Sequence, residues 1–143
     1  MFAVLNTKIN NTLGEVDELA EIFDRPLAKE ERFSKYPVAV FYYTGLRNEF
    51  ETNQENMKEY QYQISLITET EVAGMDKAHG TVMAGLIDAV MAQFDEDWDQ
   101  GASSEGHRIW WKVDDVQMGV FEEHNGLLIS ATLNLTIKVI TNN

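Results

Sequence analysis

The chain has 143 residues, no cysteine, and 24 acidic against 11 basic side chains, which gives a formal net charge of −13 at pH 7. The lack of cysteine excludes disulfides, thiol chemistry and thiolate zinc sites, and the negative charge argues against an extended surface for nucleic acid or anionic membranes. Since 44% of the residues are hydrophobic, we expect one folded domain over residues 1–143.

The first ten residues, MFAVLNTKIN, contain neither the basic segment nor the apolar stretch of a secretory signal. The longest apolar run covers only Val38 to Tyr43, far short of a membrane-spanning helix. We therefore expect a protein that is neither secreted by a standard signal nor membrane-spanning.

Residues 2–13 predict an amphipathic helix of about three turns, which Gly14 would stop. Its apolar residues at helical spacing are Phe2, Leu5, Ile9 and Leu13. The next stretch, ELAEIFDRP, fits either a helical stripe or a short strand, and Pro26 would end both. We favour the short strand.

The stretch YPVAVFYYTG, residues 36–45, predicts a strand because valine and aromatic residues dominate it. Apolar side chains would occupy both of its faces, so we expect both to be covered. We interpret it as the central strand, with one face under the main helix. A neighbouring subunit or a folded-over segment would cover the other face, and we assign Phe41 and Tyr43 to a subunit interface.

Residues 46–58 predict a polar connection that is longer than a median loop. Beyond it, apolar and polar residues alternate from Tyr60 to Leu66, which predicts a half-buried strand. The simplest pairing of this strand with residues 36–45 is an antiparallel hairpin.

Residues 73–94 predict the main helix, because apolar residues from Met75 to Phe94 form one wide stripe at helical spacing. An adjacent face carries small residues that would let the N-terminal helix or a neighbouring subunit approach closely. These are Ala78, Gly85, Ala89 and Ala92. We leave Gly85 out of the assigned subunit interface.

Residues 95–107 predict an acidic loop. In the strand that follows, the apolar alternation slips by one position at Asp114 and Asp115, which predicts a β-bulge or a small loop. The HNG sequence at 124–126 predicts a hairpin turn. The last strand alternates cleanly from Leu127 to Val139, so one of its faces is wet or meets something polar.

The predicted order of elements is αβββαββ. Strands joined by hairpins and separated by helices indicate an α+β fold, in which helices pack on one face of an antiparallel or mixed β-sheet.

The acidic run Asp95, Asp97 and Asp99 resembles the opening of an EF-hand calcium loop. The glycine, Gly101, comes one position late, and Glu105 comes one position early for the bidentate ligand. A solvated acidic helix end is the simpler interpretation, so we assign no metal.

The sequence also lacks the usual frames of a catalytic site. His79, His107 and His124 occur singly and form no zinc motif, no serine lies in a nucleophile elbow, and no glycine-rich phosphate loop occurs. We therefore expect no enzyme and no cofactor.

Trp110 and Trp111 are consecutive, so on a strand they would point to opposite faces. We expect one in the core and assign Trp110 to a subunit interface, since tryptophan is enriched at protein contacts. The alternative is a tryptophan that lies flat on its own sheet beside a lysine.

The segments RFSKYPVAVFYYTG, YQYQISLITET and VDDVQMGVFEEHNGLLISATLNLTIKVI, with a helix between the last two, resemble the tail terminator proteins of long-tailed bacteriophages. The resemblance covers most of the chain by element order, and its sequence marks are the Tyr36-Pro37 strand and the closing hairpin. It implies a ring, hexameric in the family, that caps the tail tube, stops its polymerisation and presents a surface to the head connector. The family has no catalytic residues to carry over.

The resemblance further implies three protein partners, namely further copies of the chain, the tail tube protein and the head-tail connector protein. DNA would only pass through the bore, no membrane would be involved, and the protein would sit in the virion tail after assembly in the host cytoplasm. By location, the polar connection corresponds to a partner-facing loop of the family. The residues assigned to it are Arg47, Asn48, Glu49, Glu51 and Glu55.

Two other functions stay open at this point. The first is a neck or head-completion protein of the same virion, which would share the resemblance. The second is a calcium-binding or small-ligand module built on Asp95, Asp97 and Asp99.

Overall fold

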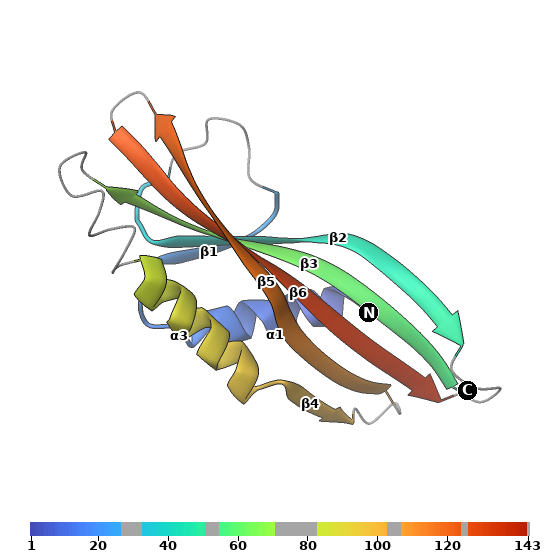
Figure 1. The fold of residues 1–143 in the computed structure, drawn as a ribbon. Coiled ribbons are helices and arrows are strands. Elements are labelled where there is room, and N and C mark those ends of the chain that lie inside the picture. The colour runs from blue at the N-terminus through green and yellow to red at the C-terminus, as the bar shows by residue number, and fades with distance from the viewer. Residues whose placement is uncertain (27–32, 51–54, 71–82, 103–106, 124–125, 143) are drawn as a thin grey trace.

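The computed structural model describes residues 1–26, 33–50, 55–70, 83–102, 107–123 and 126–142. Within them, two helices pack on one face of a curled, six-stranded sheet (Figure 1). In chain order the elements are α1 (Phe2–Gly14), β1 (Glu21–Asp24), β2 (Val38–Phe50), β3 (Glu55–Thr70), α3 (Met83–Glu96), β4 (Asp99–Ala102), β5 (His107–Glu123) and β6 (Gly126–Asn142).

The strands are arranged in the order β1-β2-β3-β6-β5-β4. β1 pairs with β2 in parallel, and every other pair is antiparallel. The prediction of an α+β fold with a mixed sheet is therefore confirmed. The predicted order αβββαββ is wrong, because the short strand β4 lies between α3 and β5. Its sequence, DQGA, has no apolar alternation that would distinguish it from a loop.

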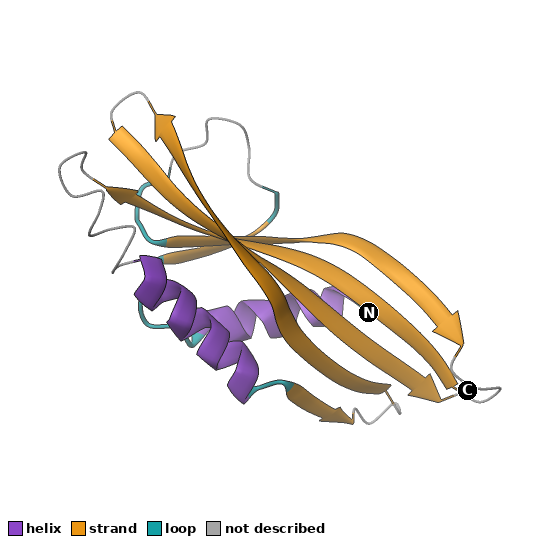
Figure 2. Cartoon of the chain, in the orientation of Figure 1, coloured by secondary structure: helices purple, strands orange, loops and turns teal. Residues whose placement is uncertain are grey.

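Both helices cover the same face of the sheet, which we call the helix face; the opposite face is called the polar face (Figure 2). α1 buries Leu5, Ile9 and Leu13 there, as its apolar spacing predicted. The described part of the main helix, α3, continues to Glu96 and buries its apolar stripe at positions 83, 86, 87, 90 and 94. Residues 73–82 of the predicted helix, including Met75 and Ala78, lie outside the described residues.

The last strand is the centre of the sheet. β6 lies between β3 and β5, and its alternate side chains from Ile129 to Val139 are all buried against the helices. Fully burying an aliphatic side chain stabilises a fold by about 1.5–3 kcal/mol, so this one row contributes a large part of the core. The long alternation of β6 is confirmed, whereas the prediction that residues 36–45 form the central strand is wrong. β2 has only β1 outside it.

The two faces of β2 are covered by different parts of the chain. Ala39 and Phe41 lie on the helix face, in the main core. Val38 and Val40 lie on the other face with Ile67, in a second small core. Phe23 and the folded-over segment around Phe33 and Tyr36 pack against this second core. None of the surface of Phe41 is exposed, so its assignment to a subunit interface is wrong. Sequence alternation separates the faces but does not say which one the helices cover.

Candidate functional site

The stretch expected to be a long loop is mostly strand. β2 continues to Phe50 and β3 begins at Glu55, and the antiparallel ladder of the predicted hairpin runs on to the pair Phe50↔Asn56. Most of residues 46–58 are polar, and the apolar ones, Leu46, Phe50 and Met57, do not alternate regularly, so the sequence reads as a loop. The expectation of a polar connection over 46–58 is therefore wrong, although the hairpin itself is confirmed.

The residues assigned to partner binding fall on this hairpin. Arg47 and Asn48 are exposed side chains of β2. Glu49 and Glu55 belong to the ends of β2 and β3 by backbone pairing, and Glu51 lies outside the described residues. The hairpin presents Arg47 and Asn48 on a strand, which fixes their direction more firmly than a loop would.

A β-bulge in β2 brings two apolar side chains onto the same face. The register shifts between Tyr43, opposite Tyr62, and Gly45, so that Leu46 comes opposite Tyr60. Tyr60 and Tyr62 belong to the main core on the helix face, so Tyr43 and Leu46 also lie on that face. Tyr43 is 57% exposed and Leu46 is 48% exposed. They form an apolar surface beyond the N-terminus of α1, where the Phe2 ring lies 4.5 Å from that of Tyr43.

Two long strands have outer edges that the sheet leaves unpaired. β1 pairs with β2 only as far as Phe41, and β4 pairs with β5 only as far as Trp110. Beyond β4, one further backbone hydrogen bond of 3.0 Å joins Trp111 N to Trp98 O. Within the described part of the chain, β2 from Tyr42 and β5 from Lys112 therefore have no strand on their outer side. Such edges present free backbone donors and acceptors that can pair with another chain.

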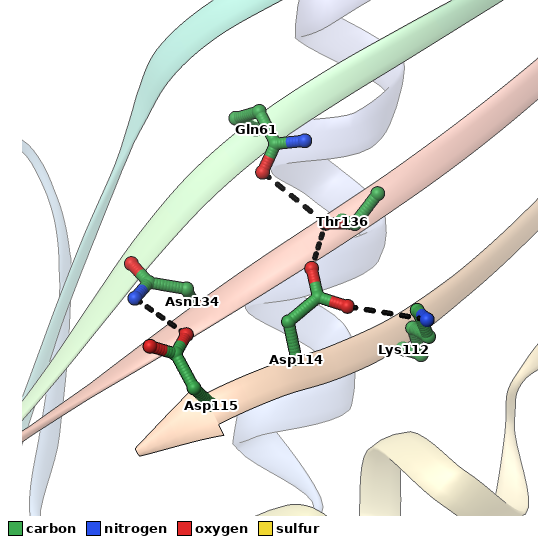
Figure 3. Close-up of polar contacts among 6 residues, drawn as sticks. All are labelled: Gln61, Lys112, Asp114, Asp115, Asn134 and Thr136. Carbon is green, nitrogen blue, oxygen red and sulfur yellow. Dashed lines mark hydrogen bonds and ion pairs between the residues drawn. The ribbon is translucent and has the colours of Figure 1, made fainter. Parts of the chain in front are cut away.

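On the polar face, a bulge in β5 gathers two carboxylates (Figure 3). The register shifts between Val113 and Asp115, so Asp114 is the extra residue. A regular strand would send these neighbouring carboxylates to opposite faces, but the bulge turns both to the polar face. Asp115 accepts a hydrogen bond of 2.7 Å from Asn134, and Asp114 accepts one from Thr136. The predicted bulge is confirmed.

The rest of this network joins three strands. Thr136 Oγ1 lies 3.2 Å from Gln61 Oε1 of β3, and Lys112 Nζ lies 3.4 Å from Asp114 Oδ1 (Figure 3). Thr136 is buried, so its hydrogen bonds avoid the cost of an unsatisfied hydroxyl. The network links β3, β5 and β6 through side chains on the polar face at the centre of the sheet. It also explains why the side chains of β6 on this face are polar.

The two consecutive tryptophans point to opposite faces, as their positions predicted. Trp111 is buried on the helix face, where its Nε1 donates to Phe94 O at 3.0 Å and its ring packs edge-on against the Phe94 ring. Trp110 is half-buried on the polar face, with the Arg108 guanidinium 4.9 Å from its ring centroid. Its assignment to a subunit interface stays a prediction.

A cleft of about 540 Å³ opens beside Trp110. Its lining residues are Asp95, Trp98, Trp110, Trp111, Lys112, Thr136 and Lys138. All three tryptophans of the chain therefore border one cleft. The sequence did not predict it, because Trp98 lies in the segment that was expected to be an acidic loop. The only available signal was the concentration of tryptophan at positions 98–111.

The three aspartates expected at a possible calcium loop have different surroundings. Asp95 is in the last turn of α3, Asp97 accepts a hydrogen bond from the Gln93 amide at 3.2 Å, and Asp99 begins β4 and lies 3.8 Å from Arg108. The part of the chain that the structure describes contains no group of three or more His, Asp or Glu that could hold a metal ion. Gly101 has its backbone in β4, and Glu105 lies outside that part.

The other positions singled out in the sequence are less informative. His107 Nδ1 lies 2.7 Å from Thr141 Oγ1, whereas His79 and His124 lie outside the described residues. Gly85 is exposed, and a Cβ added there would meet no atom within 4 Å. No other described element approaches it closely, so the expectation of close packing at this glycine is not met among the described residues.

No protein-family model matches the sequence, and a search of curated proteins finds no match. Neither described helix is long and apolar enough to cross a membrane.

Proposed function

We propose that this chain is a structural protein of a bacteriophage tail. It assembles into a ring, hexameric as in the family that it resembles, and the ring caps the tail tube, terminates its polymerisation and forms the interface to the head connector. It works without a catalytic site or cofactor, in the virion tail, after assembly in the host cytoplasm.

The observation that carries the proposal is the pair of uncovered strand edges. β2 and β5 lie near opposite ends of the sheet order, so an edge of one copy can meet the other edge of the next copy. Such a head-to-tail contact generates a closed ring if the rotation between neighbours closes.

Exposed apolar side chains at both edges support the same contact. Tyr43 and Leu46 project from β2 on the helix face. On β5, Met118 pairs with the buried Ala131, which puts it on the helix face too, and it is 43% exposed. If β2 of one copy pairs with β5 of the next, these side chains meet on one face and extend the core across the contact.

Capping then follows from having two unlike surfaces. One side of the ring offers the tube end a surface like that of the next tube ring, and the other side lacks the edge that a further tube ring needs. The charge of −13 selects a basic rim on the partner and orients docking. Negative charge along the bore would also keep DNA from adhering as it passes.

The test combines the purified chain with its matching tube protein. We expect rings by native mass spectrometry, or rings that form only on the tube, and capped tubes of fixed length by electron microscopy. Tubes of unaltered, indefinite length would refute the proposal. A ring seen at the neck of the virion rather than on the tube end would assign the chain to head completion instead.

A matched pair of variants tests the β2 edge. Leu46→Lys puts a charge into the proposed contact, so we expect it to abolish ring formation and capping. Val4→Lys is the control, because Val4 is also 48% exposed but lies on α1 rather than at a strand edge. Loss of capping in both variants, or in neither, would contradict the proposed role of the edge.

A further inference from the structure

We propose that the cleft bordered by Trp98, Trp110 and Trp111 is a binding site for a segment of a partner protein that carries an aromatic side chain next to a single carboxylate. The proposal goes beyond the ring and does not depend on it. The following contacts define the chemistry of the occupant.

The floor of the cleft is built from two cross-strand pairs. Trp110 is the register partner of Lys138, and Lys112 is the register partner of Thr136, so the four side chains come from alternate positions of β5 and β6 and share one face. They lie on the polar face, opposite the face of Tyr43, Leu46 and Met118 that the ring contact would use. The polar-face side of the site is therefore held by two paired strands.

The aromatic surface of the cleft is available to a ligand. Trp98 is 54% exposed, and Trp110 is half-buried with one face taken by the Arg108 guanidinium. Exposed tryptophan is enriched where partners bind. A planar or apolar side chain packed against these rings would remove apolar surface from water.

The charges around the cleft leave room for one anionic group. Lys112 pairs with Asp114, and Arg108 lies near Asp99. Lys138, by contrast, makes no ion pair with the described residues, including its cross-strand neighbour Glu59. In a chain of net charge −13, an exposed ammonium group beside three tryptophans fits a single carboxylate.

The same charges disfavour nucleic acid. Stacking on tryptophan and pairing with lysine would also suit a nucleotide. However, Asp95 lines the cleft and Asp114 pairs with Lys112, so a phosphate with up to two charges, or a chain of phosphates, would be repelled by nearby carboxylates. A peptide with one carboxylate carries less negative charge than a phosphate chain, so it meets less of this repulsion.

Intrinsic fluorescence tests the proposal directly, because the three tryptophans that border the cleft are the only ones in the chain. The probe is a short end-capped peptide with a central Phe-Glu pair, titrated into the full chain. We expect a saturable change in emission that weakens with added salt, and smaller responses to matched Phe-Lys and Ala-Glu peptides. Equal responses to all three peptides, or none at millimolar concentration, would overturn the proposal.

Charge reversal locates the binding. We expect Lys138→Glu to weaken binding of the Phe-Glu peptide about tenfold, since it replaces an attraction with a repulsion. Lys58→Glu is the matched control: it changes the net charge equally, but Lys58 pairs with the buried Val139 and so lies on the helix face. Equal weakening in both variants would mean that only the overall charge matters, which overturns the site.

Two further measurements complete the test. Trp98→Leu removes an exposed ring, so we expect it to weaken binding while the urea unfolding midpoint stays close to that of the parent. A titration with adenosine monophosphate or a short oligothymidylate should give no saturable change. If these nucleotides bind and the Phe-Glu peptide does not, the cleft is a nucleotide site and the proposal is wrong.

Discussion

At the scale of single residues, Tyr62 links the first helix to the sheet. Its hydroxyl donates a hydrogen bond of 2.6 Å to Asn6 Oδ1 of α1, and its ring is buried in the main core. Burial raises the pKa of Tyr62 well above its usual range, and the Asp24 carboxylate raises it further. Burial also raises the pKa of the neighbouring Tyr60. The docking of α1 thus depends on protonated tyrosines.

This burial predicts a loss of stability in alkali. An unfolded tyrosine loses its proton near pH 10, whereas folded Tyr62 keeps it. The contribution of Tyr62 to the free energy of unfolding is therefore complete below about pH 10. It falls as the pH rises above this value, because the unfolded state then binds fewer protons than the folded state. We expect Tyr62→Phe to flatten this alkaline decline, and to cost about 1 kcal/mol at neutral pH through the lost hydrogen bond to Asn6.

Urea unfolding at a series of pH values from 8 to 11.5 measures both effects. Tyr42→Phe is the control, since Tyr42 lies on the opposite face of β2, outside the aromatic cluster of Tyr62. We expect its alkaline decline to match that of the parent chain. An unchanged decline in Tyr62→Phe would show that this tyrosine does not govern the alkaline transition.

At the scale of elements, the bulge in β5 keeps a long strand in phase with the core. Ile109, Trp111 and Val113 face the helices before it, and Val116 and Met118 do so after it. Without the extra residue, Val113, Asp115 and Val116 would alternate regularly. One of the two neighbouring aspartates can therefore be removed without turning a neighbour to the wrong face, and deleting Asp114 or Asp115 gives the same sequence.

Two single-residue deletions test this. Deleting Asp114 leaves the alternation intact and removes only its contacts with Thr136 and Lys112, so we expect a loss of at most about 2 kcal/mol in unfolding free energy. Deleting Lys112 instead turns Val113 to the polar face and Asp114 towards the buried Leu135. We expect that variant to lose at least about 3 kcal/mol, because a carboxylate enters the core.

Urea denaturation followed by circular dichroism compares the two deletions. Both shorten β5 by one residue, so each serves as the control for the other. Equal losses would mean that the register of β5 can slip, and that Asp114 is not the residue that the bulge accommodates.

The elements that the sequence predicted correctly are those with one apolar face. α1, the described part of α3, and β6 each bury a single stripe, and periodicity reveals such stripes directly. β4 and the outer parts of β2 and β3 were missed because backbone pairing, rather than apolar side chains, holds them in the sheet. Hydrogen bonds between strands leave no mark on side-chain periodicity.

The candidate sites were harder to predict than the elements. Alternation placed Trp110 and Trp111 on opposite faces. It could not show that Trp98 lies near them in the fold, because this proximity depends on α3 ending at Glu96 and on β4 pairing with β5. Phe41 was misassigned for a similar reason. A strand that is apolar on both sides does not reveal which side the helices take and which side a short segment covers.

At the scale of the whole molecule, the charge of −13 opposes self-association. Copies that approach one another carry like charges, while the contact that we propose for the ring is largely apolar at Tyr43, Leu46 and Met118. Salt screens the repulsion, since the screening length falls from about 10 Å at 0.1 M to about 3 Å at 1 M. Apolar contacts are not weakened by this screening.

We therefore expect the fraction of assembled chain to rise with sodium chloride at a fixed protein concentration, as measured by sedimentation velocity. Leu46→Lys should stay monomeric throughout the series, and Val4→Lys should follow the parent chain. Dissociation of the parent assembly by salt would mean that ion pairs, rather than apolar edges, hold the copies together.

The central position of β6 also bears on how the chain acquires its shape. β6 is the last of the six strands along the sequence, yet it fills the place between β3 and β5. During synthesis, β3 and β5 cannot be joined into one sheet until β6 has left the ribosome. Until then, the apolar side chains of both strands lack the β6 side chains that they pack beside in the folded sheet. Contacts so distant along the chain slow folding. We therefore expect the sheet to close from its middle once β6 is available, and until then the inner edges of β3 and β5 are open to pairing with other nascent chains.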